Sequence, residues 1–161
     1  HRSKSEVVIN TNVLVETANC PENGTCTLEL MAKKSITFKK DDFGILYPVI
    51  SEGEKTILKY TYNKYASPKY QDGHYTEIVY AEFDSVLHTT SIENKELEQF
   101  KFHFGRLCFF KGETGYYPIT RGKFKLEKKG KDSVRIELNF EVGEVPQIVK
   151  DFSEIISIKS N

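Results

Sequence analysis

The chain has 161 residues, and 23 basic residues balance 23 acidic ones, so the formal net charge at pH 7 is zero. This balance predicts no nucleic-acid partner, and the length predicts one domain over residues 1–161. Aromatic residues make up 12% of the chain and none is Trp, a composition that favours β-structure.

The chain begins with His1-Arg2-Ser3 and not with Met. We interpret residues 1–3 as a cloning remnant that follows a removed or truncated tag, so we expect the native start to be missing. The absence of a signal peptide at this end is therefore no evidence for a cytosolic protein.

The spacing of two cysteines indicates a cellular compartment. Cys20 and Cys26 flank a turn-rich segment in which Asn23-Gly24 favours a tight turn. Cysteines on either side of such a turn can approach to bonding distance, so we predict a Cys20–Cys26 disulfide and an extracytoplasmic, oxidising compartment. Two free thiols or a metal pair are the alternatives. The spacing is wider than zinc sites use and no second Cys/His pair follows, so we predict no metal and no cofactor.

Short runs of β-branched and aromatic residues in the first half predict strands. These runs lie at residues 5–17, 27–32, 35–39, 45–50, 55–63 and 75–83. Lys33-Lys34 indicates a kink or bulge between two of them, and residues 41–44 form a turn. Pro48 suits an edge strand, because proline cannot donate to a ladder. Residues 91–99 are expected to form one short helical turn, with a capping box at residues 90–93.

Residues 99–142 are expected to form three consecutive strands. The last strand alternates apolar and charged residues from Val134 to Val142, as a half-buried antiparallel strand does. In the first strand Arg106 would face the core, so we expect a β-bulge at Gly105 that turns Leu107 and Phe109 inward instead.

After Gly143 the spacing of apolar residues changes to that of a helix. The residues on this spacing are Val145, Ile148, Val149, Phe152, Ile155 and Ile156. Pro146 suits a first helical turn, so we predict one amphipathic helix over residues 146–157, packed on the sheet. A final strand over residues 154–159 is the alternative. The predicted fold class is all-β, an antiparallel sandwich or flattened barrel of about eight to ten strands with this C-terminal helix.

No catalytic motif accompanies the histidines. Apart from His1, only His74, His88 and His103 are present, and none lies in a nucleophile motif. Cys108 follows His103 by five residues, but a cysteine in an aromatic strand is expected to be a buried small hydrophobic residue. We therefore predict that the protein is not an enzyme.

Six basic residues lie close together in the second half of the chain. They are Arg121, Lys123, Lys125, Lys128, Lys129 and Lys131. One interpretation is contact with an anionic partner. We adopt the other, a solvated outer strand face with lysines that protect an edge, because the whole chain is neutral.

The polar loop at residues 64–74 is the candidate binding surface. It carries Tyr65, Tyr70 and His74. Tyrosine offers rigid amphipathic contact area at low entropic cost, so we predict a binding module with a protein or glycan partner. The alternative is that the neighbouring tyrosines only pack between strands. A protease inhibitor that acts through the same loop is a further hypothesis.

A third hypothesis is a β-barrel that carries a small apolar ligand. Its interior would be lined by Phe100, Phe102, Phe104, Phe140 and Tyr80. The lack of Trp weighs against a lipocalin.

The segment Gly115–Leu126, GYYPITRGKFKL, resembles a pattern of small cell-envelope lipoproteins of Bacteroidota. In these proteins G-x-Y-x-I-x-x-G-x-L-x-I precedes a turn and a closing strand; here Tyr117, the second tyrosine, lies two residues before Ile119. The resemblance covers residues 99–142. It implies an exported β-sandwich, at the outer membrane or cell surface or secreted, whose only membrane contact would be a lost lipid anchor. It transfers no catalytic residue.

Overall fold

The computed structural model describes residues 6–65, 75–108 and 114–158, which form twelve strands and one short 3-10 helix. The strands are β1 (Val7–Val8), β2 (Val13–Glu16), β3 (Gly24–Lys40), β4 (Leu46–Lys64), β5 (Tyr75–Asp84), β6 (Val86–Leu87), β7 (Thr90–Glu93), β8 (His103–Leu107), β9 (Gly115–Pro118), β10 (Gly122–Lys128), β11 (Ser133–Phe140) and β12 (Asp151–Ser157). The helix, η1 (Asn94–Phe100), lies between β7 and β8.

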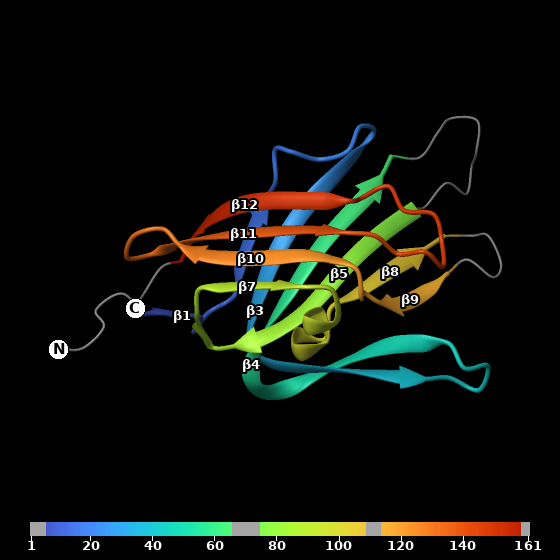
Figure 1. Cartoon of the computed structure of the whole chain (residues 1–161), viewed down its shortest axis with the longest axis horizontal. Coiled ribbons are helices and arrows are strands. Elements are labelled where there is room, and N and C mark those ends of the chain that lie inside the picture. Colours follow the sequence, from blue (N-terminus) through green and yellow to red (C-terminus); the bar gives the residue numbers. More distant parts are fainter. Residues whose placement is uncertain (1–5, 66–74, 109–113, 159–161) are drawn as a thin grey trace.

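Two antiparallel sheets pack face to face (Figure 1). The larger has the strand order β2-β3-β4-β5-β8-β9 and the smaller the order β12-β11-β10-β7, while β1 and β6 pair separately. In Figure 1 the strands of the smaller sheet cross in front of the larger sheet at a steep angle. Among the described residues both sheets have free edges, so the predicted all-β sandwich is confirmed and the two sheets do not form a closed barrel.

Both sheets contribute to one hydrophobic core. Tyr60 of β4 stacks on Phe152 of β12 with ring centroids 4.1 Å apart, and Phe83 of β5 stacks on Phe124 of β10 at 5.4 Å. Burial of a side chain of this size stabilises the fold by roughly 1.5–3 kcal/mol. These aromatic pairs therefore hold the two sheets against each other.

The regular strand at the end of the predicted three-strand segment is confirmed. β11 buries Val134, Ile136 and Leu138 while the residues between them are partly exposed. It pairs with β10 on one side and with β12 on the other. The period of two therefore reflects a central strand with one face on the core.

The predicted helix over residues 146–157 is wrong, because this part of the chain contains strand β12. β12 pairs with β11 from Ser157 to Asp151 and buries Phe152 and Ile156, whereas Ile155 stays 59% exposed. Without β12, β11 would be an edge strand with unpaired backbone groups next to a large apolar core. Pairing with β12 gives these backbone groups partners and covers the core. The alternative prediction of a final strand is therefore correct, although this strand begins earlier, at Asp151.

The short helix is present but begins later than predicted. Residues 90–93 form β7, which pairs with β10, so they cannot start a helix. Glu93 and Glu96 form the capping box instead, and the N–H of Glu93 donates to Oε1 of Glu96 at 3.0 Å.

The predicted bulge at Gly105 is wrong. β8 pairs with β5 in unbroken register, and Arg106 stays on the inner face with 7% of its surface exposed. The lack of a side chain at Gly105 leaves room for the ring of Tyr116 on β9. A Cβ at this position would lie only 2.3 Å from Cε2 of that ring. Phe109 lies outside the described residues. Arg106 can remain inside because polar groups surround it, as described below.

The distal halves of β3 and β4, residues 34–52, fold back as an arm across the outer face of the larger sheet (Figure 1). The predicted kink is confirmed. Lys33 has φ of 55°, and the register of the hairpin shifts at Lys34. Phe38 of the arm stacks on His103 of β8, with centroids 3.6 Å apart. The predicted edge position of Pro48 is confirmed, because the arm has only two strands.

Candidate functional site

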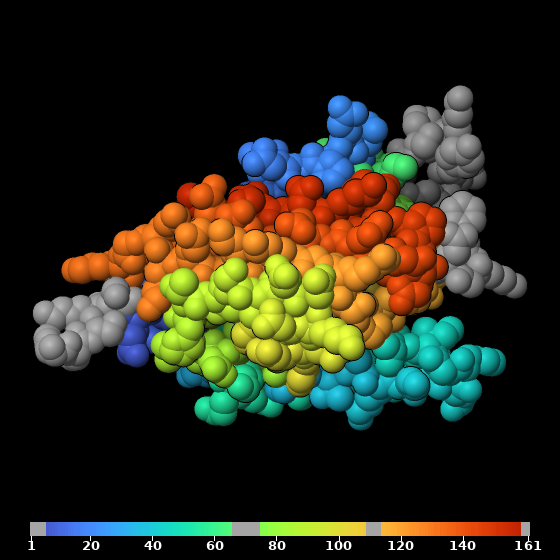
Figure 2. Space-filling model, in the orientation of Figure 1, coloured from blue at the N-terminus to red at the C-terminus, as the bar shows by residue number. Residues whose placement is uncertain are grey.

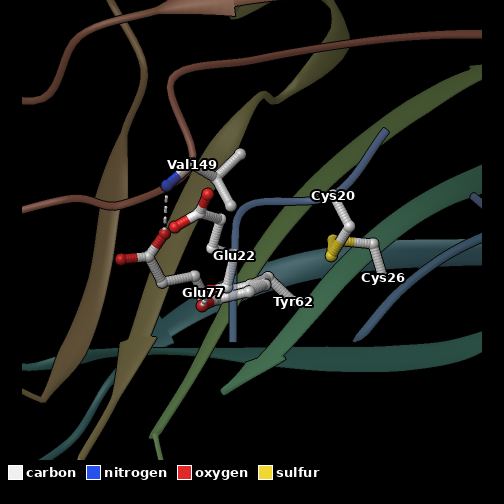
Figure 3. The surroundings of a disulfide bond; sticks show 6 residues. All are labelled: Cys20, Glu22, Cys26, Tyr62, Glu77 and Val149. Carbon is white, nitrogen blue, oxygen red and sulfur yellow. Dashed lines mark hydrogen bonds between the residues drawn. A yellow bond between two sulfur atoms is a disulfide. The ribbon is translucent and has the colours of Figure 1, made fainter. Parts of the chain in front are cut away.

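The predicted disulfide is present near the start of β3 (Figure 3). Cys20 and Cys26 are bonded, and their Cα atoms are 5.6 Å apart. Cys26 belongs to β3 and is 2% exposed, which anchors one side of the loop. Within the loop, the carbonyl of Glu22 accepts a hydrogen bond from Tyr62 Oη at 3.0 Å. The loop between the cysteines is therefore tied to β4 as well as closed by the disulfide.

Next to this loop, Glu77 of β5 is a carboxylate with only 1% of its surface exposed. Its Oε1 accepts the N–H of Val149 at 2.7 Å (Figure 3). Its Oε2 accepts the N–H of Ile148, also at 2.7 Å. Oε2 also accepts the hydroxyl of Tyr75. Because N–H and O–H donors surround the buried charge, Glu77 holds the loop between β11 and β12 onto β5.

Arg106 completes this network from β8. Its Nε donates to Tyr75 Oη at 3.1 Å, and its guanidinium lies 5.1 Å from the centre of the Tyr75 ring. Burial and the neighbouring Glu77 carboxylate raise the pKa of Tyr75 despite the arginine, so the hydroxyl stays protonated and donates. Both oxygens of Glu77 are occupied by donors, so the arrangement suits positioning of a loop and not proton transfer.

Cys108 forms no disulfide with the other two cysteines, and the prediction that it is buried is wrong. It is half-buried because β8 ends at Leu107, one residue before it. Arg106 Nη1 lies 3.4 Å from its Sγ, and the hydroxyl of Thr114 donates to its carbonyl at 2.7 Å. His103 has other neighbours, the ring of Phe38 and the carbonyl of Lys101.

Of the three residues predicted for a binding loop, Tyr70 and His74 lie outside the described residues. Tyr65 follows β4 directly and is 60% exposed. Its N–H donates to the carbonyl of Asn23 at 2.7 Å, so its backbone is tied to the disulfide loop. Tyr65 is thus an exposed aromatic residue on a well-anchored backbone.

At the tip of the arm the sequence predicts only a turn, at residues 41–44. Asp41 Oδ1 accepts the N–H groups of Phe43 and Ile45 at 2.8 and 2.9 Å, and the Asp41 carbonyl accepts that of Gly44 at 3.0 Å. Gly44 has φ of 80°, a conformation that glycine adopts readily. These hydrogen bonds order a turn that leaves Phe43 87% exposed.

Other apolar side chains near the tip are exposed too. Ile45 and Tyr47 are 45% and 41% exposed, and Asp42 beside Phe43 is also exposed. In Figure 2 the arm (teal) extends along the lower side of the molecule to the lower right. Clustered exposed apolar residues on an ordered element mark an interaction surface more often than scattered ones do.

The basic stretch lies partly on the solvent face of the smaller sheet. Lys125 stands opposite Glu137 of β11, and Lys123 stands opposite Glu93 of β7. Arg121 lies 3.6 Å from Glu141, with both side chains more than half exposed. Opposite charges across neighbouring strands support the interpretation as a solvated face.

The residues proposed to line a carrier do not surround one cavity. Phe102, Phe104 and Phe140 pack in the main core with Phe100 against it, whereas Tyr80 lies under the arm on the other face of the larger sheet. A small cavity of about 70 Å³ opens beside Phe83, Phe100 and Phe124. That volume holds about two waters and is well below the roughly 300 Å³ of a typical ligand pocket.

Within the described ranges, no helix is long and apolar enough to cross a membrane, and no group of three or more His, Cys, Asp or Glu side chains could hold a metal ion. Comparison with known proteins finds no matching family model, no matching curated protein and no matching solved structure. The resemblance to cell-envelope lipoproteins of Bacteroidota therefore stays a prediction.

Proposed function

We propose that the protein is a non-enzymatic binding module that docks onto a partner protein through the turn at the tip of its arm. The observation that carries the proposal is Phe43, a large apolar side chain that is 87% exposed on a turn ordered by Asp41. Burial of such a side chain in a partner contributes roughly 1.5–3 kcal/mol, and aromatic residues are common binding hot spots.

The chemistry around Phe43 favours a protein pocket over a lipid surface. Asp41 and Asp42 precede Phe43 directly and are exposed. Lys39 and Lys40 are exposed as well, but the two carboxylates lie between them and Phe43, so the charges nearest to Phe43 are ones that anionic headgroups would repel. The partner we propose therefore has an apolar pocket bordered by Lys or Arg.

Contacts with the larger sheet hold the arm in place. Glu82 Oε2 accepts the N–H of Ile36 at 2.9 Å, and Lys101 Nζ donates to the carbonyl of Ile36 at 2.8 Å. Phe38 on His103 adds a stacked ring pair. An anchored arm loses little conformational freedom on binding, which favours affinity.

The same proposal includes the compartment and a second contact. The Cys20–Cys26 disulfide supports an extracytoplasmic protein, either a lipid-anchored cell-envelope protein or a secreted one. Tyr65, exposed beside the disulfide loop, supports a further contact through the loop that carries Tyr70 and His74.

The test is site-specific photo-crosslinking in the cells that naturally make the protein. A photoreactive phenylalanine analogue replaces Phe43, Tyr65 or, as a control, Ile155, which is 59% exposed on β12. We expect one discrete adduct from position 43 that position 155 does not give. Adducts at position 65 alone would move the contact to the tyrosine loop, and equal labelling at all three positions would contradict the proposal.

A further inference from the structure

The free edges of the two sheets are protected in different ways. Pro118 is the last residue of β9, and Pro48 lies within the arm. Glu154 sits in the middle of β12 at a position of the same parity as the buried Phe152 and Ile156. Proline and inward-facing charges are devices that keep an edge from pairing with another chain.

β2 is an edge strand that has neither a proline nor an inward-facing charge; its protection is limited to its short length and the exposed Glu16. It forms one end of the larger sheet and contains no Pro, Gly or Lys. Leu14 is 65% exposed, while Val13 and Val15 pack against the core. A sheet edge with unpaired backbone groups, an exposed apolar residue and no proline is a template for strand pairing.

Two hydrogen bonds establish which backbone groups of β2 face outward. Thr17 N–H donates to the carbonyl of Cys26 at 3.0 Å, and Ala32 N–H donates to Oδ1 of Asn12 at 2.8 Å. In an antiparallel ladder the bonded pairs alternate, so Val13 and Val15 bond to β3. The N–H and C=O groups of Leu14 and Glu16 therefore point away from the sheet.

We propose that β2 is a self-association edge at which two copies of this chain pair antiparallel. The two-fold axis passes between the two Val15 residues. Leu14 of each copy then exchanges both backbone hydrogen bonds with Glu16 of the other, and two six-stranded sheets join into one. The partner at this edge is thus a second copy of the chain.

Charge and side-chain matching favour a second copy at β2. In the proposed register Val15 faces Val15 and Glu16 faces Leu14, so no like charges meet. If two copies instead paired antiparallel along the whole of β12, Glu154 of one copy would face Glu154 of the other. Two like charges opposite each other are unfavourable. The four-residue strand makes a small interface, so the dimer is expected to depend on concentration.

Self-association at β2 leaves the proposed docking surface available. β2 and β9 are opposite edges of the larger sheet. The tip of the arm reaches the β9 edge, where a Cβ added at Gly115 would lie 3.6 Å from Ile45 Cγ2. The two surfaces are separate, so each can be tested without the other.

Sedimentation over a concentration series tests the proposal. We expect the mass of the wild-type chain to rise from 18.5 kDa toward twice that value. Leu14→Pro removes an outward N–H without breaking a hydrogen bond to β3, and it should keep the protein monomeric throughout. Ser153→Pro is the matched control, because it removes an outward N–H from β12 and should not change the association. A wild-type monomer at every concentration, or equal association of Leu14→Pro, would overturn the proposal.

Cross-linking gives a readout that does not depend on how Leu14→Pro folds. In a Cys108→Ser background, Val15→Cys places two thiols across a non-hydrogen-bonded pair, where Cα atoms are about 4.5 Å apart. Mild oxidation should give a covalent dimer. Leu14→Cys should give little covalent dimer, because the two Leu14 positions do not face each other across the two-fold axis. Equal yields from the two variants would contradict the proposed register.

Discussion

Phe38 of the arm lies nearly parallel to the imidazole of His103, with an angle of 11° between rings whose centroids are 3.6 Å apart. Around this pair lie Tyr80 of β5 and Tyr116 of β9, and the carbonyl of Lys101 contacts Nδ1 of His103 at 2.7 Å. The attachment of the arm therefore includes a titratable group in an aromatic environment.

This environment makes the stability of the fold depend on pH. Burial lowers the pKa of His103; the hydrogen bond to Lys101 raises it, and the Lys101 charge lowers it further. Because the folded state binds a proton less readily than the unfolded state, its stabilisation is complete above the ordinary pKa of about 6.5 and is lost as the pH falls.

We expect the free energy of unfolding to fall between about pH 7.5 and pH 5.5, and His103→Phe to reduce this loss. Phenylalanine keeps a ring against Phe38 but cannot take up a proton. Urea unfolding at each pH measures the difference, with His88→Asn, an exposed site, as the control. Equal slopes in the wild type and His103→Phe would show that another group causes the acid sensitivity.

Glu77→Gln is expected to destabilise the sandwich by about 1–3 kcal/mol. An amide nitrogen would replace an acceptor that now binds the N–H of Ile148 or Val149, so one buried donor would lose its partner. Chemical denaturation measures the loss. Glu141→Gln, on an exposed side chain near Arg121, should change stability by less than about 0.5 kcal/mol.

Removal of the disulfide by Cys20→Ala with Cys26→Ala is expected to lower the free energy of unfolding by about 2–3 kcal/mol, given a sequence separation of 6. The main cause is the greater freedom of the unfolded chain. Denaturation of the double variant measures it, and non-reducing mass analysis checks the bond in the wild type. A wild-type mass that includes the hydrogens of three thiols would contradict the pairing.

Two glycines with positive φ should differ in their tolerance of alanine. At Gly122, with φ of 145°, a Cβ would lie 2.2 Å from the carbonyl oxygen of Asn139. At Gly130, with φ of 83°, nothing lies within 4 Å. We expect a loss of about 1 kcal/mol for Gly130→Ala and about 3 kcal/mol or more for Gly122→Ala, measured by thermal unfolding. Similar losses would mean that the backbone at Gly122 can relax.

Features that depend on neighbouring residues in the chain could be predicted from the sequence. The alternation in β11 allowed its buried face to be assigned, and the Asn23-Gly24 turn brought Cys20 and Cys26 within reach of each other. Lys33-Lys34 marked the kink at the base of the arm. In each case a pattern of a few residues decides the conformation.

Features that depend on distant partners could not be predicted. Phe152 and Ile156 fit a helix and a strand equally well, and the open side of β11 decides between them. Arg106 was expected to avoid the core, because Tyr75 and Glu77 lie far from it in the sequence. The exposure of Phe43 likewise follows from where the arm lies on the sheet, which local pattern does not reveal.

The most direct test of the proposed function is the affinity for the protein that cross-links at position 43. Titration calorimetry with the purified partner would compare the wild type with Phe43→Ala and, as a control, Ile155→Ala. We predict that Phe43→Ala weakens binding at least about tenfold, or 1.4 kcal/mol, while Ile155→Ala has no effect. Unchanged affinity of Phe43→Ala would contradict docking through the tip of the arm.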